Sequence, residues 1–292
     1  MTKYPLTVER TRAELAEYLS PRRSAGERVA LVPTMGALHD GHLSLIQQAR
    51  AEADCVVASI FVNPTQFAPG EDYETYPRDE AGDLAKLAAA GCDVAYCPGV
   101  AEMYPEGSAT HVRVEGMSDL LDGRHRPHFF YGVTTIVARL FLHVQPDLAV
   151  FGEKDFQQLQ IIRRMVRDLG FPMDIRGGPT RRDPDGLAQS SRNIYLSAAE
   201  RRRAGTLHAA LIRARARLHI GAALDEVLAE ARGALAAAGF SPVDYVTAVD
   251  PTTLEALAPD RATWPSEARL LGAAWMGRTR LIDNIPLPLG QG

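Results

Sequence analysis

Two hydrophobic patterns alternate along the first 180 residues of the chain. Short apolar runs, which are typical of buried strands, occupy 29–33, 55–62, 93–97, 148–151 and 173–175. Segments with apolar residues at helical spacing occupy 42–53, 79–90, 133–144 and 155–169. Strands that alternate with helices of this length predict βαβ units and a parallel sheet. We therefore expect an α/β fold, with a Rossmann-like parallel sheet and helices on both of its faces.

The pattern changes after about residue 183, where a polar turn occupies 181–186. Two Ala- and Arg-rich helical segments and then two strand-like runs follow, at 198–218, 224–238, 243–249 and 270–285. The last run predicts a hairpin that turns at 277–279. We therefore expect a Rossmann-like domain over residues 1–183 and a smaller C-terminal α+β domain over residues 184–292.

Composition narrows the range of functions. The chain is 46% apolar and 23% charged with a formal net charge of −4, so we expect no nucleic-acid partner. Its three cysteines form no C-x-x-C pair, which suits a reducing compartment. The first residues lack the apolar stretch of a signal peptide, and no apolar run reaches the roughly 18–20 residues that cross a membrane. We therefore expect a cytoplasmic protein with no membrane partner.

The segment 33–43, with the sequence PTMGALHDGHL, runs from a predicted strand into a predicted helix. Gly36 and Gly41 allow the backbone to approach a ligand closely. The start of the helix offers free N–H groups and a partial positive charge to an anion. His39 and His42 can donate hydrogen bonds to phosphate oxygens and stabilise charge that develops on phosphorus. The segment therefore predicts a phosphate-binding site.

Two other interpretations of the histidines stay open. They can be a pair at the start of a helix with no chemical role. The spacing H-x-x-H can also bind zinc, although no third ligand stands at a useful spacing nearby.

Three further polar segments follow predicted strands or join the two predicted domains. They are NPTQF at 63–67, GEKD at 152–155 and QSSRN at 189–193. A lysine at a helix start can neutralise a triphosphate, and two hydroxyls with an arginine suit its β- and γ-phosphates. Taken singly, the three segments also fit an ordinary turn, a solvated charged turn and a Ser-rich linker.

Together these motifs resemble the pantothenate synthetase (pantoate–β-alanine ligase) family, which belongs to the nucleotidyltransferases that share the H-x-G-H signature. The resemblance continues through 61–67, 76–78, 151–159, 185–196 and 279–284. Because these ordered blocks cover nearly the whole chain, a chance match is negligible.

The resemblance implies two half-reactions. The carboxylate of pantoate attacks the α-phosphorus of ATP, which gives pantoyl adenylate and pyrophosphate. The amine of β-alanine then attacks the activated carbonyl, which gives pantothenate and AMP. ATP is thus a co-substrate with Mg²⁺ as its counterion, and a homodimer is expected because the family is usually dimeric.

The resemblance also implies the residues of the site. Those expected to bind ATP are Met35, Gly36, Ala37, Leu38, His39, Asp40, Gly41, His42, Gly152, Glu153, Lys154, Asp155, Arg181, Gln189, Ser190, Ser191 and Arg192. Those expected to be catalytic are His39, His42, Lys154, Ser190, Ser191 and Arg192, with His42 at the position of the family's proton donor. Those expected to bind pantoate or β-alanine are Asn63, Gln66 and Gln158. The loop 186–193 and the C-terminal domain are candidate lids over the site.

Asp83 corresponds to an acidic position that is associated with Mg²⁺ in some members of the family. A lone aspartate on a helix is usually a solvated surface residue. Mg²⁺ that is bound mainly by the phosphates of ATP is the simpler expectation, because this ion keeps several waters and takes few protein ligands.

The chain departs from the family pattern in a few places. Phe129 and Tyr131 stand where the family usually has His and Arg, with His128 one place away. These two changes predict altered affinity or turnover rather than a different reaction. Gln189 replaces a frequent Met and Arg181 a usually apolar residue, and a backbone contact with ATP would survive both changes.

Two rival functions stay open. A related nucleotidyltransferase that acts on a phosphorylated small molecule would share His39 and His42 but would not need Gln66 and Gln158. A non-catalytic nucleotide-binding homologue would keep the fold and lose the motif residues, which this chain retains. A class I aminoacyl-tRNA synthetase fits less well, since the chain is short and has no evident tRNA-binding module.

Overall fold

The computed structural model describes residues 6–288. Residues 1–5, on which the expectation of no signal peptide rests, lie outside the described part, as do residues 289–292. The chain forms two compact units. The first contains the chain up to Ser118, Arg126–Glu153 and Ile161–Pro179, and the second contains Asp119–His125, Lys154–Gln160 and the chain from Thr180 onward. The division into domains at residues 183 and 184 stays a prediction.

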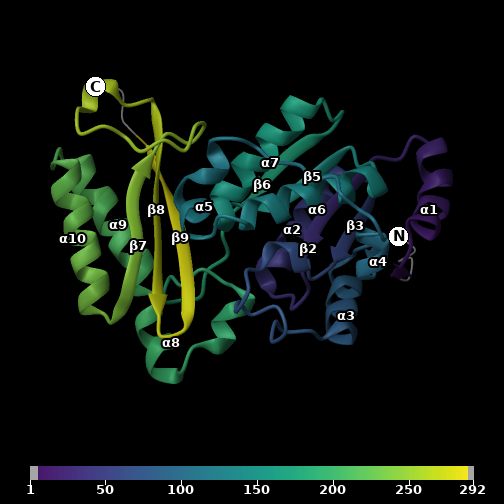
Figure 1. The fold of residues 1–292 in the computed structure, drawn as a ribbon, viewed down its shortest axis with the longest axis horizontal. Helices are drawn as coiled ribbons and strands as arrows, with labels where there is room; N and C mark the ends of the chain where they lie inside the picture. The colour runs from purple at the N-terminus through teal and green to yellow at the C-terminus, as the bar shows by residue number, and fades with distance from the viewer. Residues whose placement is uncertain (1–5, 289–292) are drawn as a thin grey trace. The chain divides into compact units, whose positions relative to one another are not determined.

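The first unit is built on a six-stranded sheet in which all neighbouring strands are parallel. Its strands are β1 (Thr7–Glu9), β2 (Val29–Thr34), β3 (Cys55–Ile60), β4 (Val94–Tyr96), β5 (Leu148–Gly152) and β6 (Asp174–Gly178). Its helices are α1 (Arg12–Ser24), α2 (Asp40–Glu52), α3 (Glu80–Ala90), α4 (Val100–Met103), α6 (Phe129–Val144) and most of α7 (Phe156–Leu169) (Figure 1). The predicted Rossmann-like parallel sheet is confirmed.

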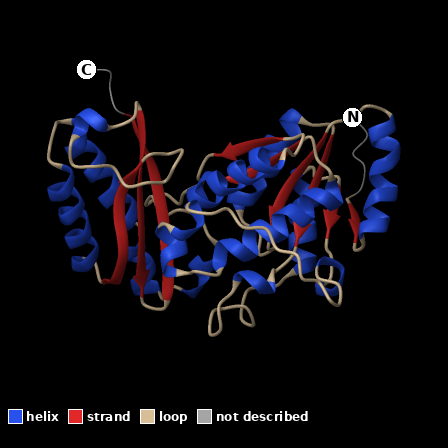
Figure 2. Cartoon of the chain, turned by 45° about the horizontal axis from the view of Figure 1, so that its top comes forward, coloured by secondary structure: helices blue, strands red, loops and turns tan. Residues whose placement is uncertain are grey.

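Helices cover both faces of this sheet. Leu148 and Val150 of β5 pack in one cluster with Ile46 of α2. Phe151, which follows Val150, contacts Phe141 of α6 instead, with ring centroids 6.3 Å apart. Because successive side chains of a strand point to opposite faces, α2 and α6 lie on opposite faces of the sheet. Helices and strands are coloured separately in Figure 2.

Two elements at the start of the chain, β1 and α1, are not apparent from the sequence pattern. β1 is only three residues long, which is too short for a recognisable alternation. α1 buries only Leu15 and Leu19, so its apolar stripe is narrow. Most predicted elements are present with shifted ends. The strand predicted over 55–62, for example, ends at Ile60.

The order of the strands reverses direction at β2. The sheet has the order β1-β4-β3-β2-β5-β6, so the chain builds outward from β2 first on one side and then on the other. Ligands in open α/β sheets bind at the carboxyl ends of strands, next to such a switch. The segment that contains His39 and His42 follows β2, and Gly152 ends the adjacent strand β5. Both predicted nucleotide segments therefore begin at neighbouring strand ends.

The second unit combines a three-stranded antiparallel sheet with helices. Its strands, in spatial order, are β7 (Phe240–Val249), β8 (Glu267–Met276) and β9 (Thr279–Pro288). Its helices are α5 (Leu121–His125), α8 (Ala198–Ala204), α9 (Thr206–His219), α10 (Leu224–Ala237) and the first turn of α7. The prediction of a second α+β part is confirmed, and so is the hairpin turn after Met276.

The single helix predicted over 198–218 is wrong. The structure has two helices, α8 and α9, which meet at Gly205. A side chain at this position would lie 2.6 Å from the backbone oxygen of Asp185, so the close approach of that turn requires glycine. The Ala- and Arg-rich composition on both sides of Gly205 hides the break in the sequence.

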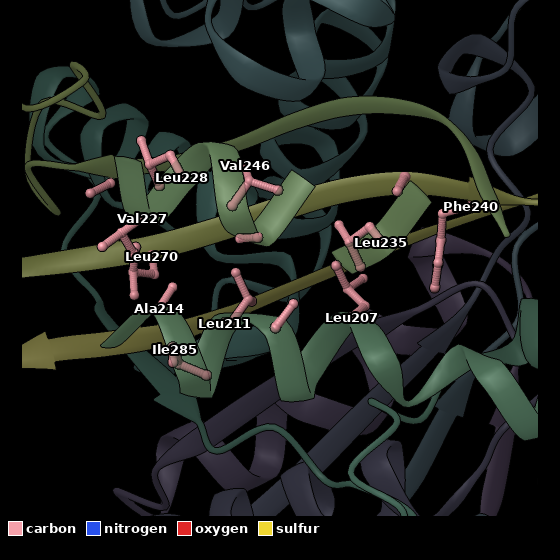
Figure 3. Packing of buried hydrophobic residues seen from close by; sticks show 14 of the residues in the cluster. Leu207, Leu211, Ala214, Val227, Leu228, Leu235, Phe240, Val246, Leu270 and Ile285 are labelled. Atoms are coloured by element: carbon pink, nitrogen blue, oxygen red, sulfur yellow. The ribbon is translucent and has the colours of Figure 1, made fainter. Parts of the chain in front are cut away.

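The core of the second unit lies between its sheet and two of its helices. Leu207 and Leu211 of α9 and Leu235 of α10 pack in one cluster with Phe240 and Leu270 of the sheet (Figure 3). Leu211 is completely buried in this layer. Burial of an aliphatic side chain of this size contributes about 1.5–3 kcal/mol, so this layer holds α9 and α10 on the sheet.

Within residues 6–288, no helix is long and apolar enough to cross a membrane.

Leu211→Ala is predicted to lower the free energy of unfolding by about 2–5 kcal/mol, because it leaves a cavity between α9 and the sheet. Ile220→Ala, just after the same helix, removes a side chain that is 81% exposed and should change stability by less than about 0.5 kcal/mol. Urea denaturation of both variants measures the difference. Equal stabilities would contradict the packing shown in Figure 3.

Candidate active site

The loop after β2 adopts a left-handed turn that one carboxylate stabilises. Gly36 and Ala37 both have positive φ, at 78° and 50°. The two oxygens of Asp83 on α3 accept the backbone N–H groups of Ala37 and Leu38, each at 2.7 Å. A Cβ at Gly36 would lie 2.9 Å from an Asp83 oxygen, so glycine is needed both for its φ and for this approach.

Asp83 is not the solvated surface residue that its sequence context indicated. It is 1% exposed, because α3 presents it to the inside of the loop. Lys86, one turn later, donates to the carbonyl oxygen of Leu38 at 2.8 Å and lies 3.8 Å from Asp83. Within the described part of the chain, no cluster of three or more His, Cys, Asp or Glu side chains could hold a metal ion. The contacts of Asp83 give it a structural role in the loop.

The two histidines form a pair at the start of α2. Their ring centroids are 4.1 Å apart. Nδ1 of His39 accepts the N–H of Gly41 at 3.1 Å, and Nδ1 of His42 accepts the N–H of His39 at 3.4 Å. A neutral imidazole that accepts through Nδ1 carries its proton on Nε2. The backbone thus assigns both rings the tautomer that offers an Nε2–H donor.

The segment after β3 connects to the loop after β2 through Gln66. Its amide nitrogen donates to the sulfur of Met35 at 2.8 Å, and its oxygen accepts from Asn63 at 3.2 Å. Tyr104 donates to the side-chain oxygen of Asn63 at 2.8 Å, and burial raises the pKa of Tyr104, so it stays a donor. Asn63 also donates to the carbonyl of Gly132 at 3.1 Å. Tyr104 belongs to no motif, so the sequence did not reveal this contact.

The segment predicted around Lys154 ends β5 at Gly152 and continues as a short 3-10 helix, Glu153–Asp155, after which α7 begins at Phe156. Lys154 is its first residue in the second unit. Lys154 Nζ lies 3.6 Å from the carboxylate of Asp155. Gln158 belongs to the first turn of the helix, and its neighbour Gln157 is 3% exposed. Gln157 accepts the N–H of Asp122 at 2.9 Å and donates to the carbonyl of Leu120 at 2.8 Å. The sequence did not reveal this role of Gln157, because the family motif assigns a role to its neighbour Gln158 instead.

The polar turn after residue 180 is a small hairpin that leads into the Ser-Ser-Arg segment. Arg182 forms an antiparallel bridge with Ala188, and the N–H of Gln189 donates to the carbonyl of Arg181 at 2.9 Å. Ser190 begins a short 3-10 helix, Ser191–Tyr195, by accepting the N–H of Arg192 at 3.3 Å. The hairpin therefore fixes the position at which the segment 190–192 starts.

Each unit brings some of the predicted residues together. In the first unit, Met35 contacts Gln66, and His39 contacts His42. In the second unit, the carbonyl of Lys154 binds Asn284 of β9, and Arg182, which was not among the predicted residues, binds Asp283.

A family model described as Pantoate-beta-alanine ligase matches residues 7–286 of the chain. The chain belongs to this family. The pantothenate synthetase of Hyphomonas neptunium is 64% identical over 282 residues, which is 96% of either chain. That of Caulobacter vibrioides is 51% identical over 278 residues, or 95% of this chain and 97% of the relative. The resemblance seen in the motifs is confirmed.

Solved structures agree with this assignment to the pantoate–β-alanine ligase family. The crystal structure of pantothenate synthetase from Thermus thermophilus has a TM-score of 0.91 and 50% identity, and the match covers 97% of this chain and 100% of that one. A pantoate-β-alanine ligase from Francisella tularensis, complexed with β-γ ATP and β-alanine, has a TM-score of 0.77 and 32% identity. That match covers 96% of this chain and 97% of the other.

Phe129 and Tyr131, two of the positions that depart from the usual ligase pattern, lie at the start of α6. The guanidinium of Arg126 lies 3.9 Å above the ring of Phe129 and forms hydrogen bonds of 2.6 and 2.8 Å with Glu71. Tyr131 stacks on His111, with centroids 4.8 Å apart. The same helix approaches the segment of Gln66 closely, because a Cβ at Gly132 would lie 2.4 Å from the carbonyl oxygen of Thr65.

Asp83→Asn is predicted to weaken ATP binding in this ligase and to lower stability by about 1–3 kcal/mol, because the amide cannot accept both N–H groups. The concentration of Mg²⁺ that gives half-maximal activity should stay the same. ATP titration and Mg²⁺ titration of the variant check the two expectations. Ala85→Gln, at an exposed position of α3, is the control. A raised Mg²⁺ requirement with normal ATP affinity would instead mark Asp83 as a metal ligand.

Proposed function

We infer that this protein is an AMP-forming pantoate–β-alanine ligase, which condenses pantoate with β-alanine through a pantoyl adenylate at the expense of ATP. The family match over residues 7–286 supports this function most directly. The relative from Francisella tularensis, complexed with β-γ ATP and β-alanine, supports ATP and β-alanine as substrates.

His39 and His42 bind the phosphates of ATP and stabilise the charge that develops at the α-phosphorus. The observation that carries this role is the backbone bond to each Nδ1, which leaves Nε2–H as the donor of each ring. Such donors are most effective when they are fixed before the reaction, because no reorganisation is then needed in the transition state. His42 stands at the position of the family's proton donor, and its Nε2–H is the hydrogen that it offers to the phosphates.

The remaining ATP groups come from the loop after β2, from the segment around Lys154 and from the Ser-Ser-Arg segment. Lys154 and Arg192 neutralise the triphosphate, and Ser190 and Ser191 donate to its outer oxygens. The backbone of the loop and of the other two segments contributes through Met35, Gly36, Ala37, Leu38, Asp40, Gly41, Gly152, Glu153, Asp155, Arg181 and Gln189.

Asn63, Gln66 and Gln158 bind pantoate, with Gln66 also near β-alanine. A carboxamide matches a substrate that carries hydroxyls and a carboxylate, because it both donates and accepts. The bonds of Gln66 to Met35 and Asn63 hold this side chain before pantoate binds. This arrangement reduces the entropy that is lost when pantoate binds.

Mg²⁺ is bound mainly by the phosphates of ATP rather than by a set of protein ligands. The use of both Asp83 oxygens by backbone N–H groups supports this assignment. The ion offsets phosphate charge while this chain's residues position the reacting groups.

The second step needs a neutral amine and exclusion of water from the adenylate, for which the loop 186–193 and the C-terminal part are candidate lids.

We place the enzyme in the cytoplasm as a homodimer. Three buried free cysteines, Cys55, Cys92 and Cys97, agree with a reducing compartment.

Purified protein is expected to form AMP only when ATP, pantoate and β-alanine are all present, with pyrophosphate release that depends on pantoate. A coupled AMP assay in which each substrate is omitted in turn measures this dependence. Nucleotide transfer to a phosphorylated small molecule without β-alanine would establish the rival nucleotidyltransferase. ATP binding without any turnover would indicate a non-catalytic homologue.

His42→Ala is predicted to lower the rate of pantoate-dependent ATP–pyrophosphate exchange by about 10²–10³-fold, the effect of losing one donor to a developing oxyanion. Gln47→Ala, at an exposed position of α2, should leave the rate unchanged. Near-normal exchange in the histidine variant would reject the catalytic role of His42.

A further inference from the structure

Asn284 of β9 binds the backbone of the segment that contains Lys154. Its side-chain nitrogen donates to the carbonyl oxygen of Lys154 at 2.8 Å, and its side-chain oxygen accepts from Arg269 at 2.7 Å. The guanidinium of Arg269 lies 4.2 Å above the ring of Phe156, the first residue of α7. Asn284 is 3% exposed, and both ends of its amide are used, so its orientation is fixed.

Asp283, the preceding residue, binds the hairpin that leads to the Ser-Ser-Arg segment. Its two oxygens accept from the guanidinium of Arg182 at 2.7 and 2.8 Å, and Arg182 also donates to the carbonyl of Gly186 at 3.0 Å. Asp283 lies 3.2 Å from Nδ1 of His208 on α9. Burial alone would raise the pKa of Asp283, but its hydrogen bonds with His208 and Arg182 lower it below its usual value. The carboxylate is therefore charged at neutral pH.

Side chains alternate between the two faces of β9, which explains how the neighbouring residues Asp283 and Asn284 bind two different segments. Successive side chains point to opposite faces of a sheet. Asp283 shares a face with Ile285, which belongs to the core beneath α9. Asn284 therefore projects from the other face, toward the start of α7. One peptide unit of β9 thus connects Lys154 to the hairpin 182–188.

We propose that Asp283 and Asn284 are positioning residues for ATP, which set the place of Lys154 and of the Ser-Ser-Arg segment relative to each other. This inference rests on the proposed function, because it assumes that both segments bind ATP. Neither residue is assigned to the substrate itself. The groups that bind ATP must be positioned accurately. A mutation far from the reacting atoms that displaces them by about 1 Å can reduce the rate by about 10²-fold.

Asn284→Asp tests the role of Asn284 with little change in size. The carboxylate can still accept from Arg269, but it places an oxygen opposite the carbonyl of Lys154 where an N–H stood. The expected result is a KM for ATP raised about tenfold and a lower kcat in pantoate-dependent ATP–pyrophosphate exchange. The KM for β-alanine in the AMP assay should change less than about twofold.

Arg182→Lys is the second, milder variant. Lysine keeps the positive charge near Asp283 but cannot form the two parallel hydrogen bonds of a guanidinium. We expect it to raise the KM for ATP in the same direction and by a smaller factor. This variant tests the inference even if Asn284→Asp does not fold.

Ile285→Ala is the matched control for a purely structural role. Ile285 is the next residue of β9 and is 4% exposed in the core. Its truncation destabilises the same sheet and leaves the bonds to Lys154 and Arg182 in place. The control should keep a normal KM for ATP at a temperature where all variants are folded, as judged by thermal unfolding. Equal ATP kinetics in Asn284→Asp, Arg182→Lys and Ile285→Ala would overturn the inference.

Lys154→Ala separates failure of the inference from failure of the proposed function. If Lys154→Ala impairs exchange while Asn284→Asp and Arg182→Lys behave as wild type, only the positioning role is rejected. If Lys154→Ala itself has normal kinetics, the assignment of Lys154 to ATP fails, and the positioning role fails with it.

Discussion

The candidate nucleotide site depends on the pair of hydrogen bonds between Asp83 and the backbone of the loop after β2. A left-handed turn with a non-glycine residue costs about 1–2 kcal/mol, and a buried carboxylate costs more unless it is hydrogen-bonded. In this loop the hydrogen bonds between the turn and Asp83 offset both the conformational cost of the turn and the cost of burying the carboxylate. The turn directs the N–H groups of Ala37 and Leu38 to one point, and the carboxylate supplies both acceptors. The histidine pair begins directly after this turn, so its position depends on these bonds.

A second buried aspartate has a comparable role in the second unit. Asp283 binds the hairpin through Arg182, as Asp83 binds the loop through backbone N–H groups. ATP and pantoate are both anions, so a carboxylate without such partners would repel them. Internal hydrogen bonds occupy the oxygens of these two carboxylates, and the proposed contacts with substrate come from imidazole, ammonium, guanidinium, hydroxyl and amide groups. The charge pattern is thus consistent with an enzyme whose two substrates are anions.

The departures from the usual ligase pattern are accommodated by local contacts. Phe129 supports the guanidinium of Arg126, and that guanidinium pairs with Glu71 in the segment after Gln66, which we propose binds pantoate. An aromatic ring can hold a cation over its face. Phe129, which stands where the family usually has histidine, therefore keeps the guanidinium of Arg126 in a fixed place. The altered residues belong to the part of α6 that packs against the segment of Gln66, which is where an effect on pantoate affinity would arise.

The sequence by itself determined the alternation of strands and helices and the family, and it predicted candidate reactive groups. These follow from local periodicity and from short motifs, which need no knowledge of distant contacts. It did not determine the break at Gly205, because composition on both sides favours a helix and only the approach of Asp185 requires glycine there. Nor did it assign Asp83, Tyr104, Asp283 or Asn284 to their partners. Each of these residues acts through a bond to a segment far along the chain, so only the tertiary structure decided its role.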